Sequence, residues 1–273
     1  MKRSISFFIS FVFLVLAFSC TKESGVQNGE IEYSTDNEHI KATSANDAII
    51  HQYLYDHEGR IVEENGRYNY TRYFYDAIGR LKRAESAVDY YASSLYVEKN
   101  NELMTSQNSI VNRYSLYKYD KGRLSKIENY ANFTGTRFEY ASMQTFEYKG
   151  SNIAKVNLHD PTGKVTQFHV YTYDDYGNVI NEKYYSNNVS PYELISETSY
   201  KYDNYKNPYG IFSILGSPGL FSNVNNIIET SLTRHYEVQG FDKYSNSKNI
   251  YQYDNNGYPV KVNENGNEFE YQY

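Results

Sequence analysis

The chain has 273 residues and a formal net charge of −6, and its aromatic residues are 33 Tyr and 14 Phe without any Trp. Nucleic acid and anionic lipid repel an acidic chain, so the charge disfavours both as partners. Enrichment in Tyr and Phe favours β-strands, and no stretch of useful length has the period of a helix. We therefore expect an all-β protein.

Residues 1–19 have the order of a secretory leader. Lys2 and Arg3 precede a mostly apolar run over residues 5–18, and Cys20 follows shortly after it. A membrane-spanning helix needs about 20 apolar residues, and this run is shorter, so we expect the leader to be cleaved. Cleavage removes Lys2 and Arg3 and changes the formal charge from −6 to −8.

The segment Leu16-Ala17-Phe18-Ser19-Cys20 resembles the lipoprotein signal of Gram-negative bacteria, with Phe18 inserted into the usual spacing. The resemblance implies cleavage before Cys20, lipid on this only cysteine, and a membrane anchor. The alternative is an ordinary secretory signal followed by an accidental cysteine. Thr21 stands where an Asp retains many such proteins at the inner membrane. The resemblance therefore implies an outer-membrane lipoprotein that faces the periplasm or the cell surface.

The chain after the leader divides into a polar segment and a large domain. Residues 20–48 are rich in Ser, Thr, Asn, Asp and Glu, a composition typical of a flexible tether. The remaining segment, residues 49–273, has the length of one large β domain. We expect a leader at 1–19, a lipidated cysteine and tether at 20–48, and a single domain at 49–273.

One short phrase recurs along the domain: an aromatic residue, any residue, Tyr, Asp, two turn residues, Gly, Arg or Asn, and an aliphatic residue. Its clearest copies are residues 53–61 and 73–81. An Asp at the first position of a type I turn can accept backbone N–H bonds, and the Gly supplies the positive φ that closes a bulged hairpin. The predicted turn residues are Asp56 and Gly59, Asp76 and Gly79, Asp120 and Gly122 (a copy one turn residue shorter), Asp174 and Gly177, and Asp254 and Gly257.

Each copy predicts a strand, a tight turn and a returning strand, so successive copies form an antiparallel meander of hairpins. Tyr53 and Tyr55 share a sheet face, and Ile61 should lie opposite Tyr55. We expect about 12 to 16 strands, and strand twist of about 20° per pair curls so long a sheet into a strongly curved sheet or half-open barrel. Segment 207–226, rich in Gly, Pro and Asn, is the one substantial irregular element.

The Tyr-Asp-x-x-Gly-Arg-Leu phrase resembles the YD repeat of Rhs-type proteins, whose repeats form long β-spirals around a cargo. A closer resemblance is to an uncharacterised family of Bacteroidetes-type lipoproteins, and it is carried by residues 202–210, 223–226 and 253–259. That resemblance spans most of residues 50–273. It implies YD repeats that build a porin-like antiparallel sheet in a water-soluble protein, and it implies no catalytic residues.

The sequence presents no convergent catalytic set. Its six histidines lack the His-x-x-x-His and His-Glu-x-x-His spacings of zinc sites, and no Asp-x-Asp-x-Asp-Gly loop supplies calcium, so we expect neither metal nor cofactor. Phosphate loops and Gly-x-Ser-x-Gly elbows are missing as well. His159, Asp160 and His169 could meet across a hairpin, but ordinary strand polarity is the favoured explanation for them. We therefore expect a protein that is not an enzyme.

Tyrosine combines a flat apolar ring with a hydroxyl group, which suits sugar rings and peptide chains. We expect any binding site on the concave face of the sheet or in the loop 208–221, with no residue singled out. The leading hypothesis is a membrane-anchored envelope lipoprotein that acts as a binding or scaffold module for a glycan, a peptide or an envelope protein. The alternatives are a structural lipoprotein that docks onto an envelope protein through a sheet edge, and an enzyme, which has the least support.

Overall fold

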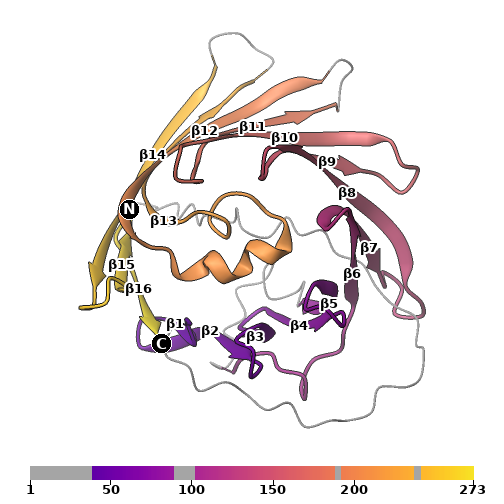
Figure 1. Cartoon of the computed structure of the whole chain (residues 1–273), viewed down its shortest axis with the longest axis horizontal. Coiled ribbons are helices and arrows are strands. Elements are labelled where there is room, and N and C mark those ends of the chain that lie inside the picture. Colours follow the sequence, from indigo (N-terminus) through magenta and orange to yellow (C-terminus); the bar gives the residue numbers. More distant parts are fainter. Residues whose placement is uncertain (1–38, 89–101, 188–191, 237–240) are drawn as a thin grey trace, which may run out of the picture.

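The computed structural model of the chain describes residues 39–88, 102–187, 192–236 and 241–273. Cys20, the leader and residues 20–38 of the expected tether lie outside the described residues. The described chain forms sixteen antiparallel strands and one 3-10 helix, η1 (Pro208–Leu215), and the strands close into a barrel (Figure 1). None of its helical segments is long and apolar enough to cross a membrane.

In chain order the strands are β1 (Ala42–Ala45), β2 (Ala48–Tyr55), β3 (Ile61–Gly66), β4 (Asn69–Tyr75), β5 (Leu81–Val88), β6 (Arg113–Asp120), β7 (Arg123–Ala131), β8 (Glu139–Lys149), β9 (Asn152–His159), β10 (Val165–Tyr173), β11 (Val179–Ser186), β12 (Glu193–Lys206), β13 (Asn225–Arg234), β14 (Lys243–Tyr253), β15 (Pro259–Glu264) and β16 (Asn267–Gln272). Each strand pairs with the next, and β16 pairs with β1. The expected antiparallel meander is confirmed, including the pairing of Tyr55 with Ile61.

The expectation of a half-open barrel is wrong, because the sheet closes. Strand β1 pairs with β2 on one side and with β16 on the other, and Thr43 lies opposite both His51 and Tyr271. This strand belongs to the segment 20–48 that the sequence predicts as a tether. Its residues Ala42, Thr43 and Ser44 are buried, so the barrel begins before residue 49. Closure satisfies the backbone groups that an open sheet would leave unpaired at its two edges.

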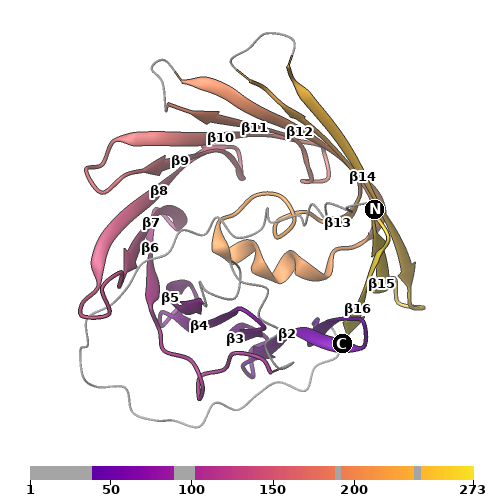
Figure 2. The same ribbon diagram turned by 180° about the vertical axis from the view of Figure 1, so that it is seen from behind.

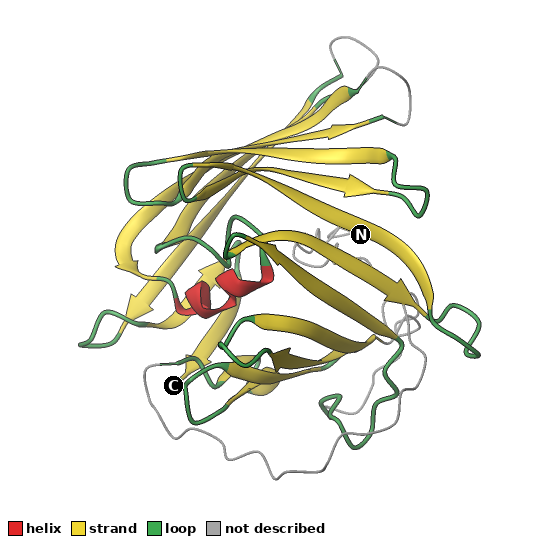
Figure 3. Ribbon diagram, turned by 45° about the vertical axis from the view of Figure 1, so that its right-hand side comes forward, coloured by secondary structure: helices red, strands yellow, loops and turns green. Residues whose placement is uncertain are grey.

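The meander gives the barrel two different ends (Figure 3). One end, here called the turn end, carries the tight turns that follow β2, β4, β6, β8, β10 and β14. The described chain also starts and finishes there, because β1 begins and β16 ends at that level. The opposite end, here called the rim end, carries the connections that follow the odd-numbered strands. The described N-terminus therefore enters the barrel at the turn end.

The segment 207–224 between β12 and β13, here called the plug, folds back inside the ring of strands (Figures 1 and 2). The Asn207 side chain accepts the N–H of Tyr209 at 3.0 Å and caps η1. Phe212 is 2% exposed and packs edge-on against Tyr53, with ring centroids 5.3 Å apart. Tyr209 of the plug packs against Tyr271 of the nearby strand β16, with ring centroids 6.0 Å apart. The plug thus supplies the centre of the hydrophobic core.

The plug covers one part of the inner surface and leaves another part open. Inward positions of β2 to β7, β15 and β16, here called the packed wall, belong to the core cluster and include Tyr53, Tyr73 and Tyr117. Inward positions of β10 to β13, here called the open wall, include Tyr184 and Tyr200, which are only partly buried. Solvent therefore reaches part of the inner face of the open wall, although Glu182, Ser196 and Thr198 on the same face are buried.

Candidate functional site: turns, latches and the open inner wall

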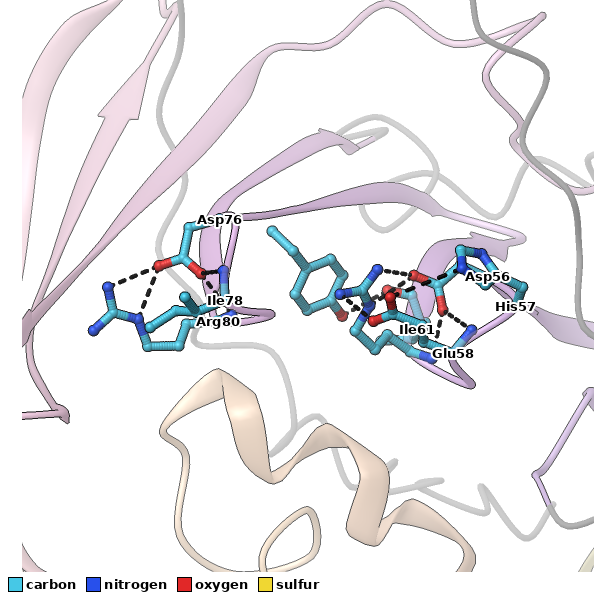
Figure 4. Close-up of polar contacts among 9 residues, drawn as sticks. Asp56, His57, Glu58, Ile61, Asp76, Ile78 and Arg80 are labelled. Atoms are coloured by element: carbon cyan, nitrogen blue, oxygen red, sulfur yellow. Dashed lines mark hydrogen bonds and ion pairs between the residues drawn. The ribbon is translucent and has the colours of Figure 1, made fainter.

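The predicted turn residues form a repeated hydrogen-bond pattern at the turn end. In the first turn, Asp56 Oδ1 accepts the backbone N–H groups of Glu58 at 3.0 Å and Arg60 at 2.9 Å (Figure 4). The carboxylates of Asp76, Asp174 and Asp254 accept from the corresponding two residues of their own turns. The glycines Gly59, Gly79, Gly177 and Gly257 have φ between 74° and 95°, a conformation that glycine adopts without steric cost.

Arginine reinforces the first two turns. Arg60 Nε donates to Asp56 Oδ2 at 2.7 Å, and Arg80 Nε donates to Asp76 Oδ2 at 2.8 Å (Figure 4). Burial alone would raise the pKa of the Asp56 carboxyl, but the bonds from the backbone and side chain of Arg60 outweigh burial and lower it. At Asp76 the backbone N–H of Arg80 is the main cause of a lowered pKa. Both carboxylates are therefore held ionised by the turn.

The turn at Asp120 has a different geometry, because its copy of the phrase is one residue shorter. Asp120 is the last residue of β6 and pairs directly with Arg123. Lys121 and Gly122 form the two-residue loop, and both have positive φ, at 48° and 80°. A two-residue loop with two positive φ angles is a type I′ hairpin turn. Gly122 thus lies in the predicted turn, whereas Asp120 flanks it.

The second tyrosine of each copy connects one hairpin to the hairpin before it. Tyr75 donates to the carbonyl oxygen of Ile61 at 2.7 Å, and Tyr119 donates to that of Leu81 at 2.9 Å. We call such a bond a tyrosine latch. Equivalent latches join Tyr55 to Ile40, Tyr148 to Leu124, Tyr173 to Ile153, Tyr202 to Val179 and Tyr273 to Pro259, while Tyr253 donates to the Asp203 carboxylate. The latches run around the whole barrel at its turn end.

Arginines of the same phrase contact the next latch. The Arg60 guanidinium lies over the Tyr75 ring at 4.9 Å from its centroid, and Arg80 lies over Tyr119 at 4.7 Å. Such cation–π contacts stabilise a pair by about 0.5–1 kcal/mol at exposed sites. The phrase therefore encodes more than a turn, because its Asp, Arg and Tyr join consecutive hairpins.

A polar cluster lies on the open wall, where β10, β11 and β12 adjoin. His169 Nδ1 lies 2.7 Å from Glu182 Oε1, and the Tyr200 hydroxyl donates to Glu182 Oε2 at 3.0 Å. The imidazole also stacks on the Tyr184 ring, with centroids 4.7 Å apart. Burial raises the pKa of Tyr200 and of Tyr171, and the Glu182 charge raises both further. These phenols therefore remain protonated hydrogen-bond donors.

His159, Asp160 and His169, which the sequence allows to meet across a hairpin, do not meet. The two histidines point to opposite faces of the wall, because the register pairs inward His169 with Val156 and places outward Phe168 opposite Asn157. His159 contacts the hydroxyl of Thr145 at 2.9 Å on the outer face. Asp160 accepts backbone N–H groups in its own turn. The partner of His169 is Glu182, which sequence reasoning missed because the two residues meet only through the strand register.

The packed wall contains a similar histidine and glutamate pair, and the two pairs have similar side-chain exposure, 26% and 7% for His51 and Glu64 against 19% and 8% for His169 and Glu182. His51 Nδ1 lies 3.1 Å from Glu64 Oε1, and the Tyr73 hydroxyl donates to Glu64 Oε2 at 3.2 Å. Burial would raise the pKa of Glu64, yet hydrogen bonds from His51, Asn69 and Tyr73 lower it.

Among the described residues, no group of three or more His, Cys, Asp or Glu side chains is arranged to bind a metal ion.

The outer face carries charged pairs that join neighbouring strands. The nitrogen and oxygen atoms of these pairs lie between 2.9 and 3.7 Å apart in Arg72–Glu63, Lys155–Glu147, Lys183–Glu197, Lys201–Glu229 and Lys261–Glu270. Exposed ion pairs contribute only about 0–1 kcal/mol each. A barrel that crosses a membrane instead presents an apolar band about 25 Å tall. On the described strands of this barrel, the outer face carries charged pairs.

No protein-family model and no curated protein matches this chain. Among solved structures, the chain is similar to a porin-like protein from Bacteroides vulgatus, at 14% identity and a TM-score of 0.51 over 86% of this chain and 98% of that chain. It is also similar to a porin-like protein from Bacteroides uniformis, at 13% identity and a TM-score of 0.38 over 81% of this chain and 89% of that chain. The first likeness shows the fold, which is an antiparallel β-barrel of porin-like architecture.

Proposed function

We propose that this chain is a cell-envelope lipoprotein, lipidated on Cys20, whose barrel is a binding module with a lumen open toward the rim end. The observation that carries the proposal is the contrast between the two faces of the open wall. Its outer face bears charged pairs such as Lys183–Glu197, whereas its inner face carries His169 and Tyr200, which are partly exposed. A wall that is charged outside and carries accessible aromatic and polar groups inside suits a water-borne barrel that takes up a ligand.

The leader and the direction of the chain support the membrane anchor. Cys20 follows the apolar run, and 18 residues separate it from His39. A chain of that length spans at most about 60 Å when it is extended. Because the described chain enters at the turn end, the anchored barrel would present its rim end away from the membrane. The porin-like names of the structural neighbours agree with a place in the envelope.

The hairpins of this barrel are, in this proposal, YD-type repeats that form a closed barrel instead of a long spiral. Support comes from the coincidence of the phrase with the latches: Tyr55, Tyr75 and Tyr119 are each the Tyr of a Tyr-Asp pair and each donate to the preceding hairpin. The repeat is therefore a structural unit, and the function resides on the open wall and not in the turns.

The anchor is tested by labelling cells with a radioactive fatty acid. The full chain should carry the label and remain with the membrane fraction, and Cys20→Ser, which removes the only cysteine, should abolish the label and release the protein. A Ser19→Ala variant keeps the cysteine and serves as the matched control. Retention of the label by Cys20→Ser would contradict the lipidation.

The open lumen is tested by cysteine labelling in the Cys20→Ser background. Thr230 on β13 points inward on the open wall and is partly exposed, whereas Ala84 on β5 points inward on the packed wall and is buried. A maleimide should modify Thr230→Cys rapidly and Ala84→Cys only after unfolding. Equal protection of both cysteines would overturn the open lumen.

The His169–Glu182 contact favours a second candidate, an enzyme, because a carboxylate that orients an imidazole can support general acid–base chemistry. We prefer binding, because the hydrogen bonds from His169 and Tyr200 hold the Glu182 carboxylate in place as an acceptor. Incubating a bound ligand with the protein and following it by mass spectrometry separates the two: an unchanged ligand supports binding, and conversion that His169→Asn abolishes supports an enzyme.

Docking onto an envelope protein would instead yield one stoichiometric partner on cross-linking in cells.

A further inference from the structure

The open wall has a chemical composition that discriminates between classes of ligand. Inward positions around the His169–Glu182–Tyr200 cluster are occupied by side chains with neutral hydroxyl or amide groups, namely Gln167, Ser196, Thr198 and Thr230. Neither Lys nor Arg occupies an inward position of β10 to β12 from Gln167 to Tyr202. Gln167 and Thr230 are partly exposed, whereas Ser196, Thr198 and Glu182 are buried, so the wall offers a few hydrogen-bonding groups, a few aromatic rings and one recessed carboxylate.

These groups argue against two ligand classes. An apolar ligand would remove water from the hydroxyl and amide groups without replacing their hydrogen bonds, which costs about 1–3 kcal/mol for each unpaired group. An anionic ligand would face Glu182 without a Lys or Arg on this part of the wall to neutralise it. An uncharged, polyhydroxylated ligand has neither difficulty, because each of its hydroxyl groups can both donate and accept.

The cluster itself is arranged to receive hydroxyl groups. An ionised carboxylate can only accept hydrogen bonds, so His169 Nδ1 donates to Glu182, and Nε2 is the ring atom left for a ligand. Tyr200 fixes the second carboxylate oxygen at 3.0 Å. Each carboxylate oxygen has more than one lone pair, so Glu182 can still accept from a ligand hydroxyl, and a charge-assisted bond of this kind is stronger than a neutral one.

We infer that the open wall binds an uncharged oligosaccharide, with Glu182 as the central hydrogen-bond acceptor and His169 and Tyr200 as the groups that orient it. The inference rests on the proposed binding function and adds the class of ligand and the residues that select it. The ligand enters through the rim end, because the plug fills the lumen beside the turn end.

The experiment uses the chain from Thr21 to Tyr273, which lacks the leader and Cys20 but includes every described strand. Its binding is measured on an array of neutral oligosaccharides, uronic-acid oligosaccharides and peptides. Titration calorimetry of the best binder then compares variants. Glu182→Gln should weaken a neutral oligosaccharide about tenfold, the loss expected when one charge-assisted hydrogen bond becomes a neutral one. Glu197→Gln, the same change on the outer face of the neighbouring strand, should leave affinity unchanged.

A second pair of variants keeps the test decisive if Glu182→Gln does not fold. Ser247 on β14 points inward opposite Thr230, and Asn246 points outward opposite Ser231. Ser247→Trp should block binding, and Asn246→Trp should not. Neutral-oligosaccharide binding that survives Ser247→Trp, or binding of only acidic glycans or peptides, overturns the inference while a binding function stands. Failure of every arm of the array overturns the proposed binding function as well.

Discussion

The packed wall and the open wall of the barrel have the same kinds of inward side chain, yet the tyrosines of the packed wall are more deeply buried. Tyr53 and Tyr73 on the packed wall are each 5% exposed, whereas Tyr184 and Tyr200 on the open wall are partly accessible. Each wall also has a histidine and glutamate pair. The difference arises from the plug, which packs against only one wall. Inward tyrosines therefore become core or candidate binding groups according to where the plug lies.

The largest effect should follow from removing the plug's anchor. Phe212→Ala deletes a buried ring that packs against Tyr53, and such losses cost about 3–5 kcal/mol of the free energy of unfolding. Tyr184→Ala on the open wall removes a partly solvated ring and should cost clearly less. Urea unfolding followed by tyrosine fluorescence gives both values. Equal losses would mean that the two walls contribute equally to the core.

A smaller effect is expected from the turn carboxylates, and it should depend on pH. Asp56→Asn weakens the bonds to Arg60 and should cost about 1.5 kcal/mol at pH 7. The folded pKa of Asp56 lies below its unfolded value of about 3.9, so its contribution is complete above that pH and is lost as the pH falls through the folded pKa. The gap between wild type and variant should therefore narrow below about pH 4.

The exposed Asp175, at the second position of its turn, provides the control for this titration. Asp175→Asn should change stability little at any pH between 3 and about 7, since surface substitutions of this kind stay within about 0.5 kcal/mol. Thermal unfolding of the three proteins across that range measures the gap. A gap for Asp56→Asn that stays constant down to pH 3 would show that the charge of the carboxylate does not contribute.

The smallest effect tests whether the latches depend on the plug. Tyr75→Phe on the packed wall and Tyr173→Phe on the open wall each remove a bond to a backbone carbonyl and should each cost about 1 kcal/mol. Tyr176→Phe is the matched control, because that side chain is 80% exposed at the tip of a turn. Chemical denaturation would show whether the two latch variants lose the same stability. If Tyr75→Phe loses stability and Tyr173→Phe does not, the latches stabilise the barrel only on the wall that packs against the plug.

Local chemistry explains how much of the fold the sequence predicts. A turn such as Asp56 to Arg60 is determined by residues within four positions of one another, so the phrase predicts hairpins, strand faces and an antiparallel meander. Closure depends instead on Ala42–Ala45, a strand without aromatic residues or alternation that lies within a polar segment. Its strand character comes from partners on β2 and β16, and a local pattern does not reveal them.

The sequence predicts the irregular segment 207–226, but the helix of the plug, its place inside the barrel and the open-wall cluster were missed, for different reasons. The plug had a usable signal, since Asn207 followed by Pro208 is an N-cap with proline at the first helical position, and Gly216 ends the helix with a positive φ. The cluster had none. His169 and Glu182 lie 13 residues apart on strands whose register shifts at a bulge between Thr172 and Tyr173. A one-residue error in that register would place Glu182 on the outer face.

The entry of the chain at the turn end has a mechanical consequence. A pull on the N-terminal chain along the barrel axis acts along β1, whose hydrogen bonds to β2 and β16 lie across the direction of the force. Those bonds are loaded together in shear and do not open one after another. Tyr55, bound to the Ile40 carbonyl at 2.6 Å, lies at the point where the load enters. The first strand is thus oriented to resist traction from its own N-terminus.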